Sequence, residues 1–267
     1  MRVAFLQFAP TFGDKNGNFQ RVAELLPEGI KLDLLVLPEL FQTGYLFENK
    51  SELNSLAEEY PAGPTLTFLK RITAQVDGAV FAGFAERSEG QFYNSAMLVL
   101  PTGESFLYRK LHLFDREKCL FTPGNLKSFM VPFRGAKLAP AICFDWFFPE
   151  YFRSLALMGA TVICHSANLV MPWYKKAAPV RALENHVYIV TSDRRGSEHR
   201  AGISLNFVGG SIVVSPKGEV LCDVDGDAEG VFFVDIVPEL AGDKRLNSNN
   251  DIFLDRRANF YELLGRS

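Results

Sequence analysis

The sequence predicts a layered α/β sandwich built on mixed sheets. Apolar, strand-like segments alternate with helix-like segments from one end of the chain to the other. Several strand-like segments are continuous runs of Val, Ile, Leu and Ala, which is typical of strands that are covered on both faces. Turn sequences at 101–103 and 215–218 predict hairpins over 98–108 and 212–221.

The individual elements follow from these patterns. We expect helices at 15–26, 64–76, 149–158 and 175–185, the third of which begins with Pro149-Glu150, residues suited to a first helical turn. No linker, compositional break or repeat interrupts the chain, so residues 1–267 are expected to form one domain. Strands are expected at 3–8, 34–37, 78–85, 92–100, 105–108, 129–132, 138–143, 161–165, 187–192, 210–214 and 230–235.

Composition excludes several classes of function. The net charge of −3 gives no electrostatic reason to expect binding to nucleic acid or to an anionic membrane. The N-terminus lacks the pattern of a signal peptide, and no apolar run is long enough to cross a bilayer. The four cysteines are scattered, so we expect a reduced cytoplasmic protein without a structural zinc site. No nucleotide-binding loop or His/carboxylate cluster occurs, so neither a cofactor nor a metal is expected.

Cys143 stands where an apolar strand stops and a helix is about to begin. The free N–H groups of such a corner can lower a thiol pKa and hold a developing oxyanion. A lone cysteine is more often a small buried hydrophobic residue, so Cys143 alone does not indicate catalysis.

Two other strands also end at residues with reactive side chains. Glu39 follows the apolar run 34–37, and Lys110 follows the strand expected at 105–108. Ligands of layered α/β folds bind at strand ends, so the carboxylate, the ammonium group and the thiol could converge. Together they could attack a carbon bonded to nitrogen, with Glu39 as base, Lys110 as oxyanion stabiliser and Cys143 as nucleophile. A turn glutamate and a solvated lysine are the structural alternatives.

The three segments resemble the nitrilase superfamily of carbon–nitrogen hydrolases. The resemblance rests on Leu-Pro-Glu-Leu, Tyr-Arg-Lys-Leu-His-Leu-Phe and Ile-Cys-Phe-Asp-Trp-Phe-Phe-Pro-Glu, in this order, with 71 residues from Glu39 to Lys110 and 33 from Lys110 to Cys143. It implies a four-layer αββα sandwich and a Glu39–Lys110–Cys143 triad. It further implies that Glu117 is a second glutamate of the site and that the Phe144 N–H helps to bind the oxyanion.

The resemblance also bears on substrate and assembly. Cys143-Phe-Asp145 followed by Pro149-Glu150 is similar to amidases and N-carbamoyl-amine hydrolases, which favours small linear amides or N-carbamoyl amines over nitriles. A nitrilase and a non-catalytic binding or scaffold protein remain the alternatives. Members of the family usually pair, so a homodimer or higher oligomer is expected, with residues 247–267 as an arm across the interface.

Several further residues have two open interpretations. Asn168 resembles a family position close to the active site, and His165 is either a donor there or a satisfied core histidine. Arg194 and Arg195 either bind a substrate carboxylate or form surface ion pairs. Three thiols, Cys119, Cys164 and Cys222, are expected to be buried and structural, and His112 is expected to orient its neighbours. Aromatic and apolar residues that line either a substrate pocket or a packing interface are Tyr45, Phe47, Trp146, Phe147, Met171 and Trp173.

Overall fold

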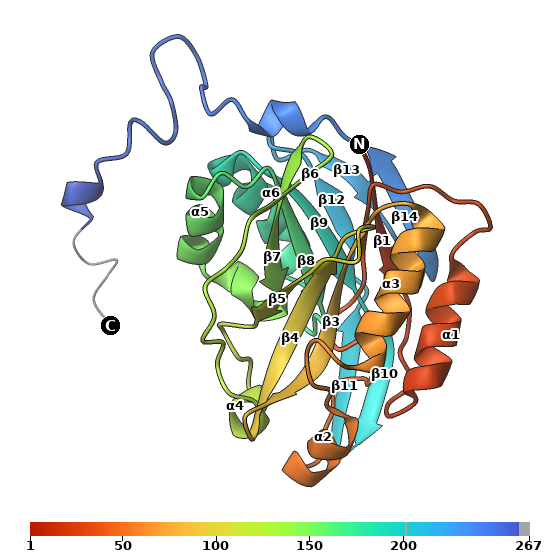
Figure 1. The fold of residues 1–267 in the computed structure, drawn as a ribbon. Helices are drawn as coiled ribbons and strands as arrows, with labels where there is room; N and C mark the ends of the chain where they lie inside the picture. The colour runs from red at the N-terminus through yellow and green to blue at the C-terminus, as the bar shows by residue number, and fades with distance from the viewer. Residues whose placement is uncertain (201, 262–267) are drawn as a thin grey trace.

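The computed structural model describes residues 1–200 and 202–261. Two mixed β-sheets of six strands each face one another, and helices cover their outer faces (Figure 1). Helices α1 (Lys15–Leu25) and α3 (Pro64–Val76) pack on the first sheet, and α5 (Pro149–Leu157) and α6 (Tyr174–Asn185) pack on the second. This arrangement confirms the four-layer α/β sandwich.

The first sheet has a parallel centre and antiparallel edges. Strands β1, β2 and β3 run parallel, while β14 pairs with β1, β4 with β3 and β5 with β4 in antiparallel fashion. In spatial order the strands are β14 (Gly230–Asp235), β1 (Arg2–Gln7), β2 (Leu34–Val36), β3 (Ala79–Ser88), β4 (Gln91–Val99) and β5 (Ser105–Arg109).

The second sheet repeats this plan. Strands β7, β8 and β9 run parallel, and β6, β12 and β13 extend the sheet with antiparallel pairs. A short 3₁₀ turn, η1 (Cys143–Phe147), connects β7 to α5. In spatial order the strands are β13 (Val220–Asp223), β12 (Ile212–Val214), β9 (Tyr188–Asp193), β8 (Val162–Ala167), β7 (Ala136–Ile142) and β6 (Val131–Phe133).

Side chains that point alternately to the two faces of a strand contribute to two apolar layers, one on each face of the sheet. In β1, Val3 and Phe5 pack into the layer between the sheets, whereas Ala4 and Leu6 pack against the helices of the first sheet. Successive side chains of a strand point to opposite faces, so a strand covered on both sides must be apolar at every position. The continuous apolar runs in the sequence therefore predicted these strands correctly.

Four elements were missed by the sequence prediction. Helices α2 (Lys50–Leu56) and α4 (Glu117–Leu120) are too short to show a helical period, and strands β10 (Arg195–Arg200) and β11 (Ile203–Val208) form a separate hairpin. The sequence of β10, Arg-Gly-Ser-Glu-His-Arg, contains no apolar residue, so nothing in it indicated a strand.

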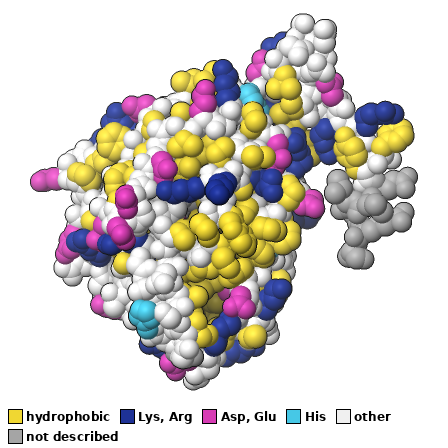
Figure 2. All heavy atoms as spheres, turned by 180° about the vertical axis from the view of Figure 1, so that it is seen from behind, with side chains coloured by type: hydrophobic (Ala, Val, Ile, Leu, Met, Phe, Trp, Pro, Cys, Tyr) yellow, Lys and Arg dark blue, Asp and Glu magenta, His cyan; other side chains and the backbone are white. Residues whose placement is uncertain are grey.

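Hydrophobic side chains also gather on the surface. Figure 2 shows a broad hydrophobic patch on the face seen from behind. Exposed apolar residues of α5 and α6 include Leu157, Val180 and Leu183. Exposed apolar patches are typical of interaction surfaces, and the expected homodimer stays a prediction.

The chain after η2 (Pro238–Ala241) leaves the body of the molecule, and η3 (Ala258–Phe260) is the last element among the described residues (Figure 1). Leu254 and Phe260 are largely exposed there, while Phe253 packs near Arg153. Residues 262–267 of the predicted arm lie outside the described residues, so the arm and the single-domain boundaries stay predictions. Within residues 1–200 and 202–261, no helix combines the length and the apolarity that crossing a bilayer requires.

Candidate active site

Three strand ends bring the predicted trio to one region. Glu39 lies in the turn after β2, Lys110 directly follows β5, and Cys143 directly follows β7. The Lys110 ammonium group lies 2.7 Å from Glu39 Oε1, and its charge acts on the Cys143 thiol. The structure therefore brings together residues that are 71 and 33 positions apart in the sequence.

Lys110 is shared between two buried carboxylates. Its Nζ donates to Oε1 of Glu39 at 2.7 Å and to Oε1 of Glu117 at 2.8 Å. Asn94 Nδ2 also donates to both, at 2.6 Å and 3.2 Å, and Glu117 Oε2 accepts the Phe114 N–H. Glu39 Oε2 has no hydrogen-bond partner among the described residues. An ammonium group has three protons, so Lys110 can still offer one to a ligand.

The turn that carries Glu39 is tightly packed against β3. Leu40, the next residue, has a left-handed backbone with φ of 47°. A Cβ at Gly83 would lie 2.6 Å from the Glu39 Cα, closer than any real contact allows. Glycine at this position therefore lets β3 pass directly beneath the turn and fixes the Glu39 side chain from below.

Burial dominates the electrostatics of the Glu39 carboxyl group. Loss of solvent raises the pKa of Glu39 to about 7, although the Lys110 charge opposes the shift. Burial alone would lower the pKa of Lys110. The charges of Glu117 and Glu39 outweigh this effect and raise the pKa of Lys110 above its usual value. At neutral pH the site therefore holds a charged lysine beside a glutamate that can both accept and return a proton.

Cys143 occupies a strained corner. Its φ of 39° lies in the left-handed region, which non-glycine residues adopt uncommonly. Its thiol is buried, and burial raises the pKa of Cys143 well above the usual value, with the Glu39 charge adding to the shift. The sequence-based expectation of a lowered pKa is therefore wrong, because η1 separates the thiol from the N-terminus of α5 and the side chain is buried.

His165, on the neighbouring strand β8, contacts the backbone of Cys143. His165 Nε2 lies 3.0 Å from the carbonyl oxygen of Cys143, and its Nδ1 lies 3.0 Å from the Tyr174 hydroxyl. Burial lowers the pKa of His165 to about 4, so the ring is neutral at neutral pH. A neutral ring donates from Nε2 to the carbonyl and accepts at Nδ1. His165 is thus a satisfied core histidine that also holds the Cys143 backbone.

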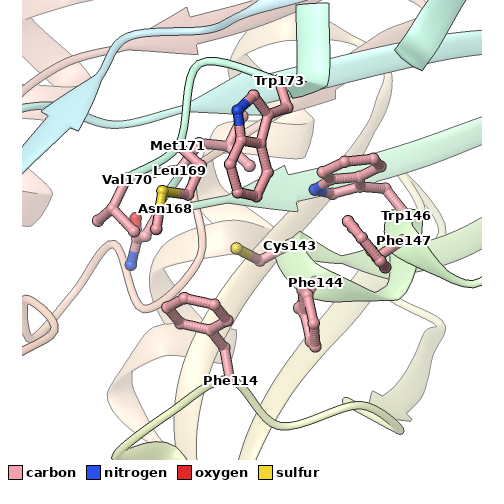
Figure 3. A pocket seen from close by; sticks show the side chains of 10 residues that line it. All are labelled: Phe114, Cys143, Phe144, Trp146, Phe147, Asn168, Leu169, Val170, Met171 and Trp173. Atoms are coloured by element: carbon pink, nitrogen blue, oxygen red, sulfur yellow. The ribbon is translucent and has the colours of Figure 1, made fainter.

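A cavity opens in front of the thiol. Figure 3 shows the side chains that line it, with the Cys143 sulfur pointing into their midst. It encloses about 440 Å³ of space, a figure that includes open solvent at its mouth. The predicted residues Phe144, Trp146 and Asn168 line it, and Phe147, Met171 and Trp173 do so as well.

Other predicted residues lie elsewhere. Tyr45 does not line the cavity. Burial raises the pKa of Tyr45 well above its usual value, and the charges of Glu117 and Glu39 add to the shift. Phe47 packs in the core against Phe12 and Phe121.

Arg194 forms an ion pair, as one of its two interpretations expected, but the pair is buried and not on the surface. Its guanidinium group is buried and forms an ion pair with Glu198, which also accepts the backbone N–H of Tyr45. Arg195 lies 3.7 Å from Glu229 in a surface ion pair.

The remaining thiols differ in exposure. Cys119 is exposed and Cys222 is half-buried, contrary to expectation, whereas Cys164 is buried as predicted. No disulfide forms among them. The described residues contain no group of three or more His, Cys, Asp and Glu side chains arranged to hold a metal ion.

Comparisons with known proteins identify the family of the chain. The family model "Carbon-nitrogen hydrolase" matches residues 2–245. The chain belongs to the carbon–nitrogen hydrolase family. It is 44% identical to a protein named nitrilase from Pyrococcus abyssi, over 98% of this chain and 99% of that protein. It is 35% identical to an (R)-stereoselective amidase from Pseudomonas sp., over 85% and 82% of the two chains.

The solved structures support the fold. A carbon–nitrogen hydrolase from Helicobacter pylori G27 superimposes with a TM-score of 0.89 at 24% sequence identity, over 99% of this chain and 98% of that one. The resemblance seen in the sequence is therefore confirmed, and this carbon–nitrogen hydrolase is an enzyme rather than a non-catalytic scaffold.

Two polar residues of the hydrolase site escaped the sequence analysis. Asn94 bridges Glu39 and Glu117, but an asparagine within a strand carries no local signal of that role. Asp145 is fully buried below the cysteine and accepts the Ile142 N–H at 2.9 Å, the Tyr108 hydroxyl at 2.7 Å, and both the N–H and ring Nδ1 of His112. Asp145 had been noticed only as part of the Cys-x-Asp pattern.

Replacing Asp145 with asparagine is expected to loosen the cysteine corner. The asparagine NH₂ group would replace one carboxylate oxygen and would face N–H or O–H groups that are themselves donors. At least one of these buried donors would then lack an acceptor, at a cost of about 1–3 kcal/mol. We expect lower stability in urea and a fall in turnover, because the Cys143 backbone shifts. Tyr108→Phe is the control, since it removes only one of the four donors. Full turnover and stability in the asparagine variant would contradict this role.

Proposed function

We propose that this carbon–nitrogen hydrolase cleaves small linear amides or N-carbamoyl amines through a thioester on Cys143. The observation that carries the proposal is the position of Lys110 between two carboxylates. Lys110 donates a hydrogen bond to one oxygen of Glu39 and to one oxygen of Glu117, while Glu39 Oε2 has no partner among the described residues. A buried carboxylate oxygen without a donor is suited to take the thiol proton.

The first step is attack on the substrate carbonyl. Glu39 accepts the thiol proton while the sulfur forms a bond to the carbon, and the carbonyl electron pair moves to oxygen. Lys110, which keeps one proton free, and the backbone N–H of Phe144 stabilise that oxyanion. Because a buried thiolate is costly, we infer that proton transfer accompanies the attack instead of preceding it.

The second and third steps return the site to its starting state. The carbonyl re-forms as the carbon–nitrogen bond breaks, and the nitrogen takes the proton from Glu39 and leaves as ammonia from an amide or as the amine from an N-carbamoyl amine. Water then gives a proton to Glu39 and attacks the thioester carbon, and the sulfur leaves and recovers that proton. Glu117 positions Lys110 throughout, through the bond of 2.8 Å.

Different observations favour an amide substrate and a nitrile substrate. The Cys143-Phe-Asp145 sequence and the relative named (R)-stereoselective amidase favour amides. The relative named nitrilase favours small nitriles as the second candidate. Measuring ammonia release from matched amides, N-carbamoyl amines and nitriles separates the two. Release from nitriles alone would overturn the amide proposal.

The rate should depend on the ionisation of Glu39. Burial raises the pKa of Glu39 to about 7, and only the carboxylate form accepts the thiol proton. We therefore expect kcat/KM to rise about tenfold per pH unit below pH 7 and to level off above it. The measurement is kcat/KM at a series of pH values, with activity at pH 8 rechecked after each exposure. A rising limb near the ordinary glutamate pKa of about 4.3 would contradict this assignment.

A further inference from the structure

The walls of the Cys143 cavity carry no charge. Among the described residues that line it, only Cys143 and Asn168 have polar side chains, and the rest are aromatic or aliphatic. Figure 3 shows the rings of Phe114, Phe144 and Trp173 around the thiol. An ionised substituent placed here would lose its water without gaining a partner of opposite charge.

The charged groups near the site lie outside the walls of this cavity. Lys110, Glu39 and Glu117 form one buried cluster, and none of the three lines the cavity. Arg194, near the end of β9, does not line it either and is paired with Glu198. Lys110 and Glu39 therefore serve the scissile bond, and the walls offer no cation to a carboxylate and no carboxylate to an amine on the acyl group.

The aromatic walls are fixed by contacts with one another. The ring centroid of Phe144 lies 5.1 Å from that of Phe114 and 5.5 Å from that of Phe147, and Trp146 lies 5.0 Å from Phe147. On the opposite side Met171 and Trp173 are 41% and 53% exposed. An apolar substituent would cover these side chains and gain roughly 25 cal/mol for each Å² of apolar surface removed from water.

Asn168 supplies a polar contact that can both donate and accept, whereas the indole N–H groups of Trp146 and Trp173 only donate. It directly follows β8, next to the end of β7 that carries Cys143, and is 2% exposed. Both its Oδ1 and its Nδ2 lack a partner among the described residues. A buried carboxamide with an open donor and an open acceptor fits a ligand that has both, such as a primary amide. A nitrile nitrogen only accepts.

We propose that the substrate is a primary amide of an uncharged apolar acyl group, branched aliphatic or aromatic, whose amide is aligned by Asn168. This inference rests on the proposed function, because it places the scissile carbon at Cys143. It narrows the small linear amides and N-carbamoyl amines to those without a carboxylate or an ammonium group on the acyl side.

Matched substrates test the charge part of the proposal. 5-Methylhexanamide and 4-carbamoylbutanoate have nearly the same shape and differ in whether the chain ends in two methyl groups or a carboxylate; 5-aminopentanamide supplies an ammonium. We expect kcat/KM for the apolar amide to exceed that of each charged amide by at least about 100-fold. Charged and apolar amides within about tenfold of each other would overturn the proposal.

A charge introduced at the rim should reverse this preference. Met171 is exposed enough for Met171→Lys to fold, and the new ammonium would face the cavity. We expect kcat/KM to rise about tenfold for 4-carbamoylbutanoate and to fall for 5-methylhexanamide. Val220→Lys, at a similarly exposed position that does not line the cavity, should leave both values unchanged. Equal effects of the two variants would count against the proposal.

Asn168→Leu tests the amide contact. We expect it to lower kcat/KM for 5-methylhexanamide at least about tenfold. Turnover of the matching nitrile, 5-methylhexanenitrile, should fall much less, because a nitrile lacks the donor for Asn168 Oδ1. An equal loss on both, or no loss on the amide, would overturn the assignment.

The same panel separates this inference from the proposed function. If nitriles react and amides do not, amide hydrolysis fails and so does the role given to Asn168. The preference for apolar groups is then read from 5-methylhexanenitrile against 4-cyanobutanoate. If neither series reacts, 5-methylhexanamide should still protect Cys143 from iodoacetamide better than 4-carbamoylbutanoate does, and equal or absent protection overturns the inference.

Discussion

Cys143→Ala is expected to abolish turnover, with a loss on the order of 10⁴-fold or more, and to leave the fold in place. The substitution removes only the sulfur, which is the group that forms the covalent intermediate. The supports of the corner, His165 on the Cys143 carbonyl and Asp145 on the Ile142 N–H, act through the backbone and remain. The measurement is ammonia release with purified protein, together with thermal unfolding.

The exposed thiol of Cys119 provides the matched control for this experiment. Cys119→Ala lies outside the cavity and should retain the full rate. Stoichiometric labelling with iodoacetamide should then separate the two thiols, because apolar amides protect only Cys143. Turnover that survives in Cys143→Ala would refute the proposed mechanism.

Lys110→Met is expected to remove activity and to destabilise the fold. The variant would leave Glu39 and Glu117 facing each other in a buried site without a cation between them. Removing one member of a buried ion pair costs about 3–5 kcal/mol, and the two carboxylates would respond by retaining protons. We therefore expect a lower urea midpoint and a stability deficit that shrinks as the pH falls.

Lys118→Met is the control for Lys110→Met, because it removes a positive charge without breaking the buried ion pair. Lys118 is exposed in the nearby helix α4, so its substitution should change stability by less than about 0.5 kcal/mol. A Lys110→Met protein that is as stable as the Lys118→Met protein would contradict the central position given to Lys110. Glu117→Gln should fall between the two, because Glu39 still pairs with the lysine.

Much of the fold could be predicted because covered strands must be apolar on both faces. The runs at β2, β7 and β8 therefore stand out in the sequence, and each is followed by a residue of the site: Glu39, Cys143 and Asn168. Strand β10 of the β10–β11 hairpin could not be predicted, since it is polar and pairs only with β11, outside the two large sheets. Strand β11, Ile-Ser-Leu-Asn-Phe-Val, alternates apolar and polar residues, and this signal was missed. The buried Glu198 of β10 reaches the Tyr45 backbone, a contact between residues 153 positions apart.

The sequence by itself predicted the layered fold, because strand periodicity is a local property of the chain. The order of its motifs and their resemblance to a known family indicated Glu39, Lys110 and Cys143, which we propose as the catalytic trio. Only the tertiary structure decided the electrostatics: the pKa of Cys143 is raised rather than lowered because burial depends on what packs over the thiol. It also decided which apolar residues line the cavity and which, like Phe47, fill the core. Both follow from contacts between distant segments, which no local pattern encodes.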